Sequence, residues 1–298
     1  MKKINGDNAN SFFSKIWYFP QCLIKSFQGN KSKLVVKKII LKPNISNSIS
    51  GSPGRILSNI FWNTINWKYL SIKFIIGLKF FDIGCGSGKY GKFYKKITGD
   101  NFHSYEGIDI YKDKNFPDEY RHILDKAENI QNYLNNHNCI VSQSALEHIE
   151  YDEFVLNQIT KYFNSKNQAF IQIHLIPAQA SLFLYLWHGW RQYSKKNLGR
   201  ISDELTKNYR VNVVVVPLGG LRSFIRHFIH ITLPNLISNI TRQKVSNAWD
   251  KSESKTSKRI KKAVFKELKT NDLVPTFWAL IISSREININ DLFLTKTY

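Results

Sequence analysis

Short apolar runs of strand length recur along the chain from Lys79 onward, and most are followed by a segment whose apolar positions have helical spacing. Strands that alternate with helices in units of about 20–30 residues predict a parallel sheet covered by helices on both faces. The last run should pair with the run before it, or with the fifth strand at the sheet edge. The predicted strands are 79–83, 104–110, 121–125, 138–142, 168–176, 210–217 and 276–284, and the predicted helices are 88–97, 127–136, 151–163 and 221–233.

This pattern divides the chain into four parts around one doubly wound α/β sheet. Residues 1–78 form a basic, mostly helical N-terminal extension, and residues 79–178 form the sheet core. Residues 179–275 form a helical insertion that is expected to cover a substrate, and residues 276–298 supply the last strand and a tail. The polar stretch Lys251–Arg259 inside the insertion is expected to be a loop.

Charge is strongly unbalanced and concentrated towards the two ends of the chain. The 298 residues include 43 Lys and Arg against 22 Asp and Glu, a net charge of +21. Residues 1–78 hold twelve basic residues and one acid, and residues 251–270 hold eight basic residues and two acids. This distribution indicates an acidic partner such as phospholipid, nucleic acid or an anionic glycan, or else simply a solvated basic surface.

Three features bear on where the protein works. Cys22, Cys85 and Cys139 form no disulfide pattern and suit a reducing compartment. Lys15 and Pro20 interrupt the first apolar run, so no signal peptide is predicted. The longest run without a charged residue, 167–190, contains proline, glutamine and histidine and is not typical of a membrane span. We therefore expect a cytoplasmic protein.

A glycine-rich turn comes directly after the first predicted strand, in the sequence FFDIGCGSGKY of Phe80–Tyr90. A phosphate-binding P-loop requires a glycine five positions before Gly88 and a Ser or Thr after Lys89, but these positions hold Ile83 and Tyr90. A dinucleotide-binding turn is matched in its glycines, but Asp82 would repel a pyrophosphate. S-adenosylmethionine has no phosphate and carries an ammonium and a sulfonium, which suit a carboxylate at this position.

At this point the sequence resembles class I S-adenosylmethionine-dependent methyltransferases. Asp82–Gly88 matches their first motif, D/E-x-G-x-G-x-G, and Asp109 stands where the family binds the ribose hydroxyls. Asp125 resembles the acid beside the adenine, and Ile140–Glu153 is similar to the fourth-strand L-E-H motif of the small-molecule and glycan branch. The resemblance covers about residues 79–178 and implies a Rossmann-like methyltransferase fold with S-adenosylmethionine as cofactor. The implied cofactor-binding residues are Asp82, Gly84, Gly86, Gly88, Asp109, Asp125, Ala127, Ser142, Gln143 and Leu146.

Methyl transfer to a hydroxyl needs an aligned nucleophile and a proton acceptor. His148 comes after the fourth strand and His174 ends the fifth, so both are candidate bases; His148 could instead pair with Glu147, and His174 could be a core residue. Glu147 and His148 could also be half of a metal site of the kind in small-RNA terminal 2′-O-methyltransferases. Those enzymes have a further glutamate where this chain has Ser144, so we expect no metal.

The segments after the fourth and fifth strands bear on the acceptor. Ser142–Ala145 lacks the N/D-P-P-Y/F/W motif of amino-base methyltransferases, which places nucleic acid behind other acceptors. The stretch Leu184–Tyr193 combines aromatic rings with polar donors and suits a flat hydroxylated acceptor such as a sugar or a polyphenol ring, or else it is a buried helix that covers the sheet. The candidate substrate residues in it are Trp187, His188, Arg191 and Tyr193.

Two further segments bear on membrane association and on the acceptor. Leu221–Leu233 is a basic amphipathic helix, which could lie on an anionic membrane or pack on the domain. Ser52–Trp67 resembles the N-terminal block of methyltransferases that act in bacterial surface-polysaccharide and lipopolysaccharide assembly. We expect O-methylation of a sugar hydroxyl in polysaccharide biosynthesis, or of a related small molecule, at the inner face of the membrane. The alternatives are an RNA methyltransferase and an inactive methyltransferase-like binding scaffold.

Overall fold

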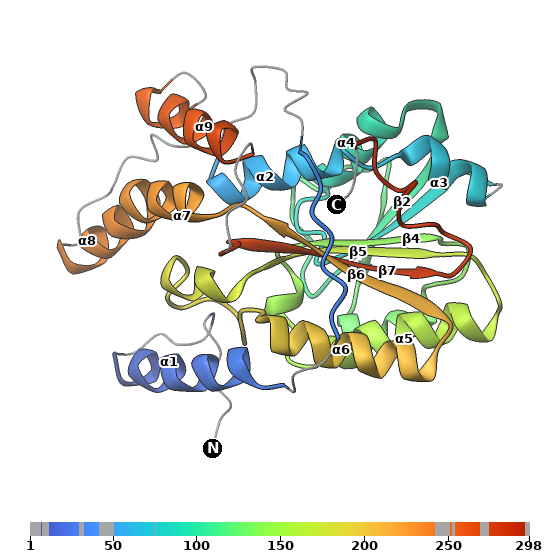
Figure 1. Ribbon diagram of the computed structural model, residues 1–298, viewed down its shortest axis with the longest axis horizontal. Coiled ribbons are helices and arrows are strands. Elements are labelled where there is room, and N and C mark those ends of the chain that lie inside the picture. Colours follow the sequence, from blue (N-terminus) through green and yellow to red (C-terminus); the bar gives the residue numbers. More distant parts are fainter. Residues whose placement is uncertain are drawn as a thin grey trace.

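The structure, a computed structural model, describes residues 7, 12–29, 33–41, 51–74, 76–241, 251, 254–268 and 274–295. Within these residues the strands form one seven-stranded sheet in the order β3–β2–β1–β4–β5–β7–β6, with helices on both faces (Figure 1). All neighbours are parallel except β7, which is antiparallel to β5 and β6. The predicted doubly wound, mostly parallel sheet is confirmed. The strands are β1 Leu78–Ile83, β2 Phe102–Asp109, β3 Arg121–Leu124, β4 Cys139–Gln143, β5 Ile171–Pro177, β6 Val211–Leu218 and β7 Phe277–Ser284.

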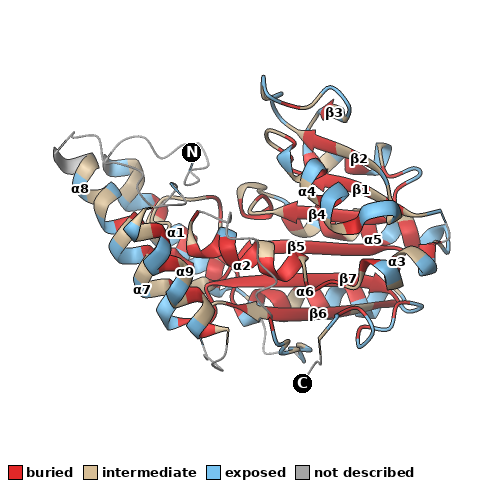
Figure 2. Ribbon diagram, turned by 90° about the horizontal axis from the view of Figure 1, so that it is seen from above, coloured by how far each residue is buried: buried red, intermediate tan, exposed pale blue. Residues whose placement is uncertain are grey.

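The helices form two layers on the sheet and a group at one end of the molecule. Helices α2, α3, α4 and α9 pack on one face, and η2, α5 and α6 pack on the other. The carboxyl ends of the parallel strands point to the end where α1, η4, α7 and α8 lie (Figures 1 and 2). The helices are α1 Phe12–Phe27, α2 Pro53–Trp62, α3 Trp67–Phe74, α4 Lys89–Thr98, η1 Gly99–Asn101, η2 Ala127–Asn132, η3 Leu146–His148, α5 Asp152–Ser165, η4 Gln179–Phe183, α6 Lys195–Asn208, α7 Leu221–His227, η5 Phe228–Thr232, α8 Leu233–Thr241 and α9 Lys255–Glu267.

The central strands are buried on both faces, which explains their nearly continuous apolar sequences. Along β5, Ile173 and Leu175 belong to the core on the α2 side, whereas Ile176 belongs to the core on the α5 and α6 side. On the α2 side, Phe80 stacks on Tyr94 of α4 with ring centres 4.6 Å apart. Removing such a buried ring costs about 3–5 kcal/mol, so these contacts fix α4 and the turn before it.

The expected pairing of the last strand is confirmed, because β7 lies between β5 and β6 and pairs with both, and β6 forms the sheet edge. One expectation from the sequence needs correction. The stretch expected to be a loop at Lys251–Arg259 instead contains the start of α9. Ser254 caps that helix by accepting a hydrogen bond from the Ser257 backbone, and Val264 is buried on its inner side. None of the helices described here is both long and apolar enough to cross a membrane.

Candidate active site

The glycine turn after β1 owes its shape to three residues with left-handed backbones. Gly84, Gly86 and Gly88 have φ angles of +69°, +51° and +66°, a region that strongly favours glycine. A Cβ at Gly84 would lie 2.5 Å from the Cβ of Ala145, and one at Gly88 would lie 2.6 Å from the ring of Phe116. A Cβ at Gly86 would meet nothing within 4 Å. Gly84 and Gly88 therefore permit close packing, while Gly86 leaves the backbone open to a ligand.

A cavity of about 360 Å³ lies beside this turn, at the carboxyl ends of β1 and β4. The sheet order reverses between these two strands, and the crevice at such a switch point is where α/β sheets bind ligands. Its wall comes from the glycine turn, the start of α2, the segment after β4, and the segment after η4. The lining residues are Ser52, Gly54, Arg55, Asp82, Gly84, Cys85, Gly86, Ser87, Lys89, Tyr90, Gln143, Ser144, Glu147, Tyr185, His188 and Phe277.

The cavity wall carries two buried carboxyl groups. Asp82 is 2% exposed and accepts a 2.6 Å hydrogen bond from the Tyr105 hydroxyl. Burial raises the pKa of Asp82 to about 7, and the charge of Asp109 adds to that rise, while the Tyr105 hydrogen bond opposes it. Glu147 is fully buried, and neither of its oxygens accepts a hydrogen bond from the described residues. The Nε2 atom of His188 lies 3.4 Å from its Oε1.

Cationic groups are present on the same wall, because Arg55 from α2 and Lys89 from α4 also line the cavity. A ligand with separated positive and negative charges would find opposite charges for both. An isolated buried carboxylate is costly, so Asp82 and Glu147 favour a ligand that brings positive charge. The electrostatics suit a zwitterion with an additional cationic centre.

Several residues predicted to bind the cofactor meet at this cavity. Asp82, Gly84, Gly86 and Gln143 line it, and Gln143 accepts a 2.9 Å hydrogen bond from the indole of Trp62 on α2. Asp109, at the end of β2, accepts a 2.9 Å hydrogen bond from the Gly86 backbone N–H, and so lies directly against the turn.

Other predicted cofactor residues are not brought there. Asp125 is satisfied locally, accepting hydrogen bonds from the side chains of Asn129 and Tyr133 and from a backbone N–H. These hydrogen bonds hold the pKa of Asp125 below its usual value. Ala127, Ser142 and Leu146 are buried and do not line this cavity, and their assignment to cofactor binding stays a prediction.

His174 is also corrected as a candidate base. Its side chain is fully buried in β5, with Nδ1 2.9 Å from the Ser142 hydroxyl and Nε2 3.2 Å from the Gln172 side chain. Burial lowers its pKa to about 3. Both ring nitrogens therefore have hydrogen-bond partners inside the protein, and the side chain does not line the cavity.

His148 lies one layer behind the cavity. Its Nδ1 is 2.7 Å from a carboxylate oxygen of Asp7, and its ring contacts that of His188 edge-on, with centres 4.3 Å apart. Burial lowers the pKa of His148, but the Asp7 hydrogen bond and the charges of Glu147 and Asp7 outweigh it, so the net shift is upward. A catalytic role for His148 stays a prediction.

Asp7, His148 and His188 together offer three groups that could bind a metal ion. Donor atoms of Asp7, His148 and His188 all lie within 4.8 Å of one another. The hydrogen bond between Asp7 and His148 already accounts for that pair. The expectation that the site holds no metal stays a prediction.

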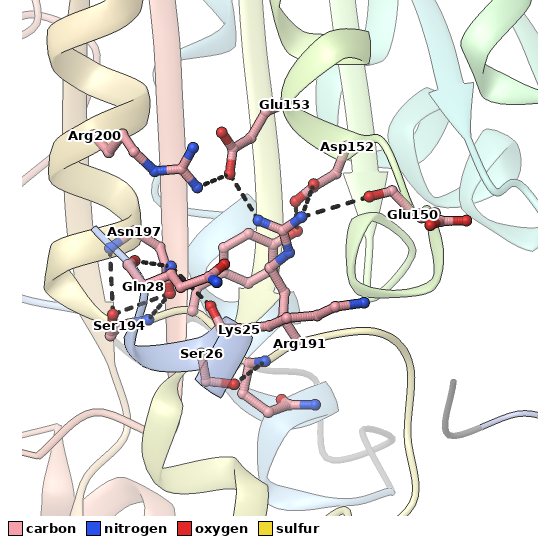
Figure 3. A network of polar contacts seen from close by, with 12 residues as sticks. Lys25, Ser26, Gln28, Glu150, Asp152, Glu153, Arg191, Ser194, Asn197 and Arg200 are labelled. Atoms are coloured by element: carbon pink, nitrogen blue, oxygen red, sulfur yellow. Dashed lines mark hydrogen bonds and ion pairs between the residues drawn. The ribbon is translucent and has the colours of Figure 1, made fainter. Parts of the chain in front are cut away.

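Of the four predicted substrate residues, two are structural. Arg191 forms ion pairs with Asp152 at 2.9 Å and Glu153 at 2.7 Å, and the Tyr193 hydroxyl donates a hydrogen bond to Asp152 (Figure 3). This network joins the segment after η4 to α5, and it explains why Tyr193 is buried and why the Arg191 side chain is only 13% exposed. Their assignment to the substrate is therefore corrected.

The other two predicted substrate residues, Trp187 and His188, contribute to a second cavity of about 240 Å³. It lies between residues 184–188 and the inner side of α7–α8, where His227, Ile231 and Leu236 close it. Tyr185 and His188 line both cavities, so the two spaces adjoin at these side chains.

Sequence reasoning missed Arg55 and Tyr185. The signal around Arg55, a serine followed by proline, predicts where a helix begins but not that α2 packs beside the glycine turn.

Comparison with known proteins finds no matching family model and no matching curated protein. Among solved structures, the chain is similar to the plantazolicin methyltransferase BamL, at TM-score 0.45 and 15% identity over 73% of this chain and 84% of that one. It is similar to a SAM-dependent methyltransferase from Archaeoglobus fulgidus, at TM-score 0.45 and 16% identity over 78% of this chain and 95% of that one. It is also similar to the methyltransferase domain of bacterial CtHen1, at TM-score 0.40 and 11% identity over 73% of this chain and 95% of that one. At these TM-scores and identities, the similarity assigns neither a family nor an activity to this chain.

Proposed function

We propose that this protein is an S-adenosylmethionine-dependent methyltransferase that methylates a hydroxyl group of a sugar in a surface glycan, or of a related small molecule. The observation that carries the proposal is the junction of two cavities at His188. One has a wall complementary to a charged zwitterion, and the other has a largely apolar and aromatic wall. We place the reaction in the cytoplasm, at the inner face of a membrane.

The first cavity fits the cofactor in three respects. Gly86 leaves open space beside the backbone, Asp82 and Glu147 offer negative charge, and Arg55 offers positive charge for a carboxylate. Asp109 has two carboxylate oxygens suited to paired ribose hydroxyls. When bound, S-adenosylmethionine supplies an electrophilic methyl carbon on sulfur and departs as S-adenosylhomocysteine.

His188 is the proposed proton acceptor. The acceptor oxygen forms a bond to the methyl carbon while the carbon–sulfur bond breaks, and sulfur keeps that electron pair. His188 takes the hydroxyl proton on a ring nitrogen and later releases it to water. Glu147, 3.4 Å from His188 Nε2, orients the ring and stabilises its protonated form. His148 packs against the His188 ring and Asp7 holds His148 by a hydrogen bond, so both act through His188 as positioning residues.

The second cavity supports a ring-shaped, hydroxylated acceptor. Tyr185, Trp187 and His188 offer ring faces and edges, and Thr232 and Asn235 offer polar groups beside them. A few polar groups among aromatic side chains are typical of sites that bind small molecules or single sugar units.

The test is methyl transfer from labelled S-adenosylmethionine into separated glycan, lipid and RNA fractions. Label in the glycan or lipid-linked glycan fraction is expected, and label in RNA alone would overturn the acceptor class. His188→Ala should lower kcat by about 10²–10⁴ with cofactor affinity nearly unchanged. Glu147→Gln should lower kcat less, and exposed His103→Ala is the matched control. Full turnover of His188→Ala would remove it as the base.

A further inference from the structure

Helix α1 presents an apolar stripe to solvent. Its inner side is fixed by Tyr18, Cys22 and Ser26, which are buried against the segment after η4. A helix that has already buried one side normally exposes polar residues on the other. Here the outer side is apolar, with Phe13 79% and Trp17 62% exposed. The exposed apolar side chains of α1 are Phe13, Ile16, Trp17, Leu23, Ile24 and Phe27.

A second stripe of the same kind runs along α7, η5 and α8. One side of this helical stretch is buried through Ser223, His227 and Ile231. The opposite side repeats an apolar residue every fourth position, and these side chains are between 40% and 60% exposed. They are Leu221, Ile225, Ile229, Leu233 and Ile237. The sequence left open whether this helix packs on the domain, and the structure leaves its apolar face uncovered.

The two stripes lie at the same end of the molecule. In both views α1 and α7–α8 lie at that end, with the η4 segment between them in Figure 1 (Figures 1 and 2). Phe183 of η4 is 54% exposed and contacts Phe19 of α1, with ring centres 6.5 Å apart. The exposed apolar residues thus come from three segments that are distant in sequence. Isolated exposed apolar residues are ordinary, but an end surface of this extent marks an interaction site.

The charge of these segments indicates the partner. Residues 12–29, 179–196 and 219–241 contain seven Lys and Arg and no Asp or Glu, and of these seven Arg191 is paired with Asp152 and Glu153. An apolar surface flanked by positive charge only is the arrangement of proteins that lie on anionic membranes. A protein partner with a basic surface would find no acidic side chain on these segments to pair with.

Between the two stripes lies a groove of about 910 Å³. Its apolar wall includes Phe27, Phe183 and Phe224 from α1, η4 and α7. Lys195 and Lys196 contribute to the same wall at the first turn of α6, which begins with a Ser194 capping box. The groove therefore combines space for an apolar chain with two cations and a helix N-terminus suited to an anion.

We propose that this end of the protein docks on an anionic phospholipid bilayer, and that the groove seats an acyl chain of one lipid with its phosphate at Lys195 and Lys196. The stripes of α1 and α7–α8 enter the boundary between head groups and acyl chains on either side of it. Binding is a property of the surface and does not rest on the proposed function, so it can be measured without any acceptor.

The experiment is co-sedimentation of the full chain with vesicles of phosphatidylcholine, or of equal parts phosphatidylcholine and phosphatidylglycerol. The chain should bind the mixed vesicles at least about tenfold more tightly, and the preference should shrink as salt rises. Ile24→Asp combined with Ile229→Asp should weaken binding at least about tenfold, because charges replace inserted apolar side chains. Ile72→Asp is the matched control, since Ile72 is 68% exposed on α3 at the opposite end.

A second arm separates a lipid from a free phosphate as the ligand of the groove. Lys195→Gln with Lys196→Gln should reduce the preference for the anionic vesicles while keeping residual binding to both kinds. Excess inorganic phosphate should leave vesicle binding the same as an inert salt at equal ionic strength does. Displacement by phosphate, no binding of the unchanged chain, or an equal loss in Ile72→Asp would each overturn the proposal. Circular dichroism confirms that each variant remains helical.

Discussion

Lowering the pH from 7.0 to 5.5 should weaken the binding of S-adenosylmethionine, because Asp82 takes up a proton. Burial raises the pKa of this carboxyl group to about 7, so it is largely neutral below that pH and ionised above it. A ligand that brings an ammonium and a sulfonium binds the ionised form. Affinity should therefore rise with pH, the direction expected when a cationic ligand needs a carboxylate.

The magnitude depends on the fraction of Asp82 that is ionised. With a pKa of about 7, roughly half of the groups are ionised at pH 7.0 and about 3% at pH 5.5. If only the ionised form binds, the dissociation constant rises about fifteenfold, or about 1.6 kcal/mol. The cofactor's own amino group stays protonated over this range, since α-amino groups titrate near 8.

The raised pKa of Asp82 also makes the free energy of unfolding of the ligand-free protein depend on pH. The group has a higher pKa in the folded than in the unfolded chain, so its favourable contribution to stability exists at low pH. That contribution is lost as pH rises from about 4 through 7, and it amounts to at most about 4 kcal/mol. Saturating cofactor should oppose the loss, because it compensates the buried charge.

Titration calorimetry at several pH values measures the effect, with Asp82→Asn as the variant. The asparagine keeps the shape and can still bond to Tyr105, but it cannot ionise. It should bind the cofactor weakly at every pH, with the slope removed. A slope that persists in Asp82→Asn would assign it to another group, such as His148, and a flat profile in the unchanged protein would refute the reasoning.

Three further substitutions test the placement of the site. Gly86→Val should abolish cofactor binding in calorimetry, because its side chain would occupy the open space at a backbone φ of +51°. Asp109→Ala should cost about 1.5–3 kcal/mol of cofactor affinity, and an unchanged dissociation constant in the folded variant would exclude it from the site. Arg191→Met should lower the free energy of unfolding by about 3–5 kcal/mol, since Asp152 would lose its buried partner, and cofactor affinity per folded molecule should stay normal.

The sheet was predictable because its signals are local. Each strand is an apolar run bounded by turn residues, and parallel strands buried on both faces leave little ambiguity in such a pattern. The turn Asp82–Gly88 was predictable for the same reason, since its glycines and its acid come after one strand in fixed order. The partners of β7 were predicted too, but nothing within 276–284 indicates that this strand pairs with β5 and β6 at once.

The errors in the site have a common physical origin. Arg191 and Tyr193 have the chemistry of substrate-binding groups, but their partners Asp152 and Glu153 lie about forty residues earlier in the sequence. His174 fits the alternating pattern of β5, but this pattern does not reveal that buried Ser142 and Gln172 surround its ring. Burial and long-range pairing decide these cases, and neither can be read from a local pattern.

Helix α7–α8 links the two proposals of site and surface. Its inner side supplies His227 and Ile231 to the second cavity, while Ile225 and Ile229 on its outer side belong to the exposed stripe. An element that lies in a bilayer boundary on one side and closes an acceptor cavity on the other would bring a lipid-borne acceptor to the cavity without releasing it into water. The first cavity adjoins this end too, because Tyr185 and His188 line both cavities. The geometry of a parallel sheet thus gives a reason why a chain with this surface would act on acceptors held at a membrane.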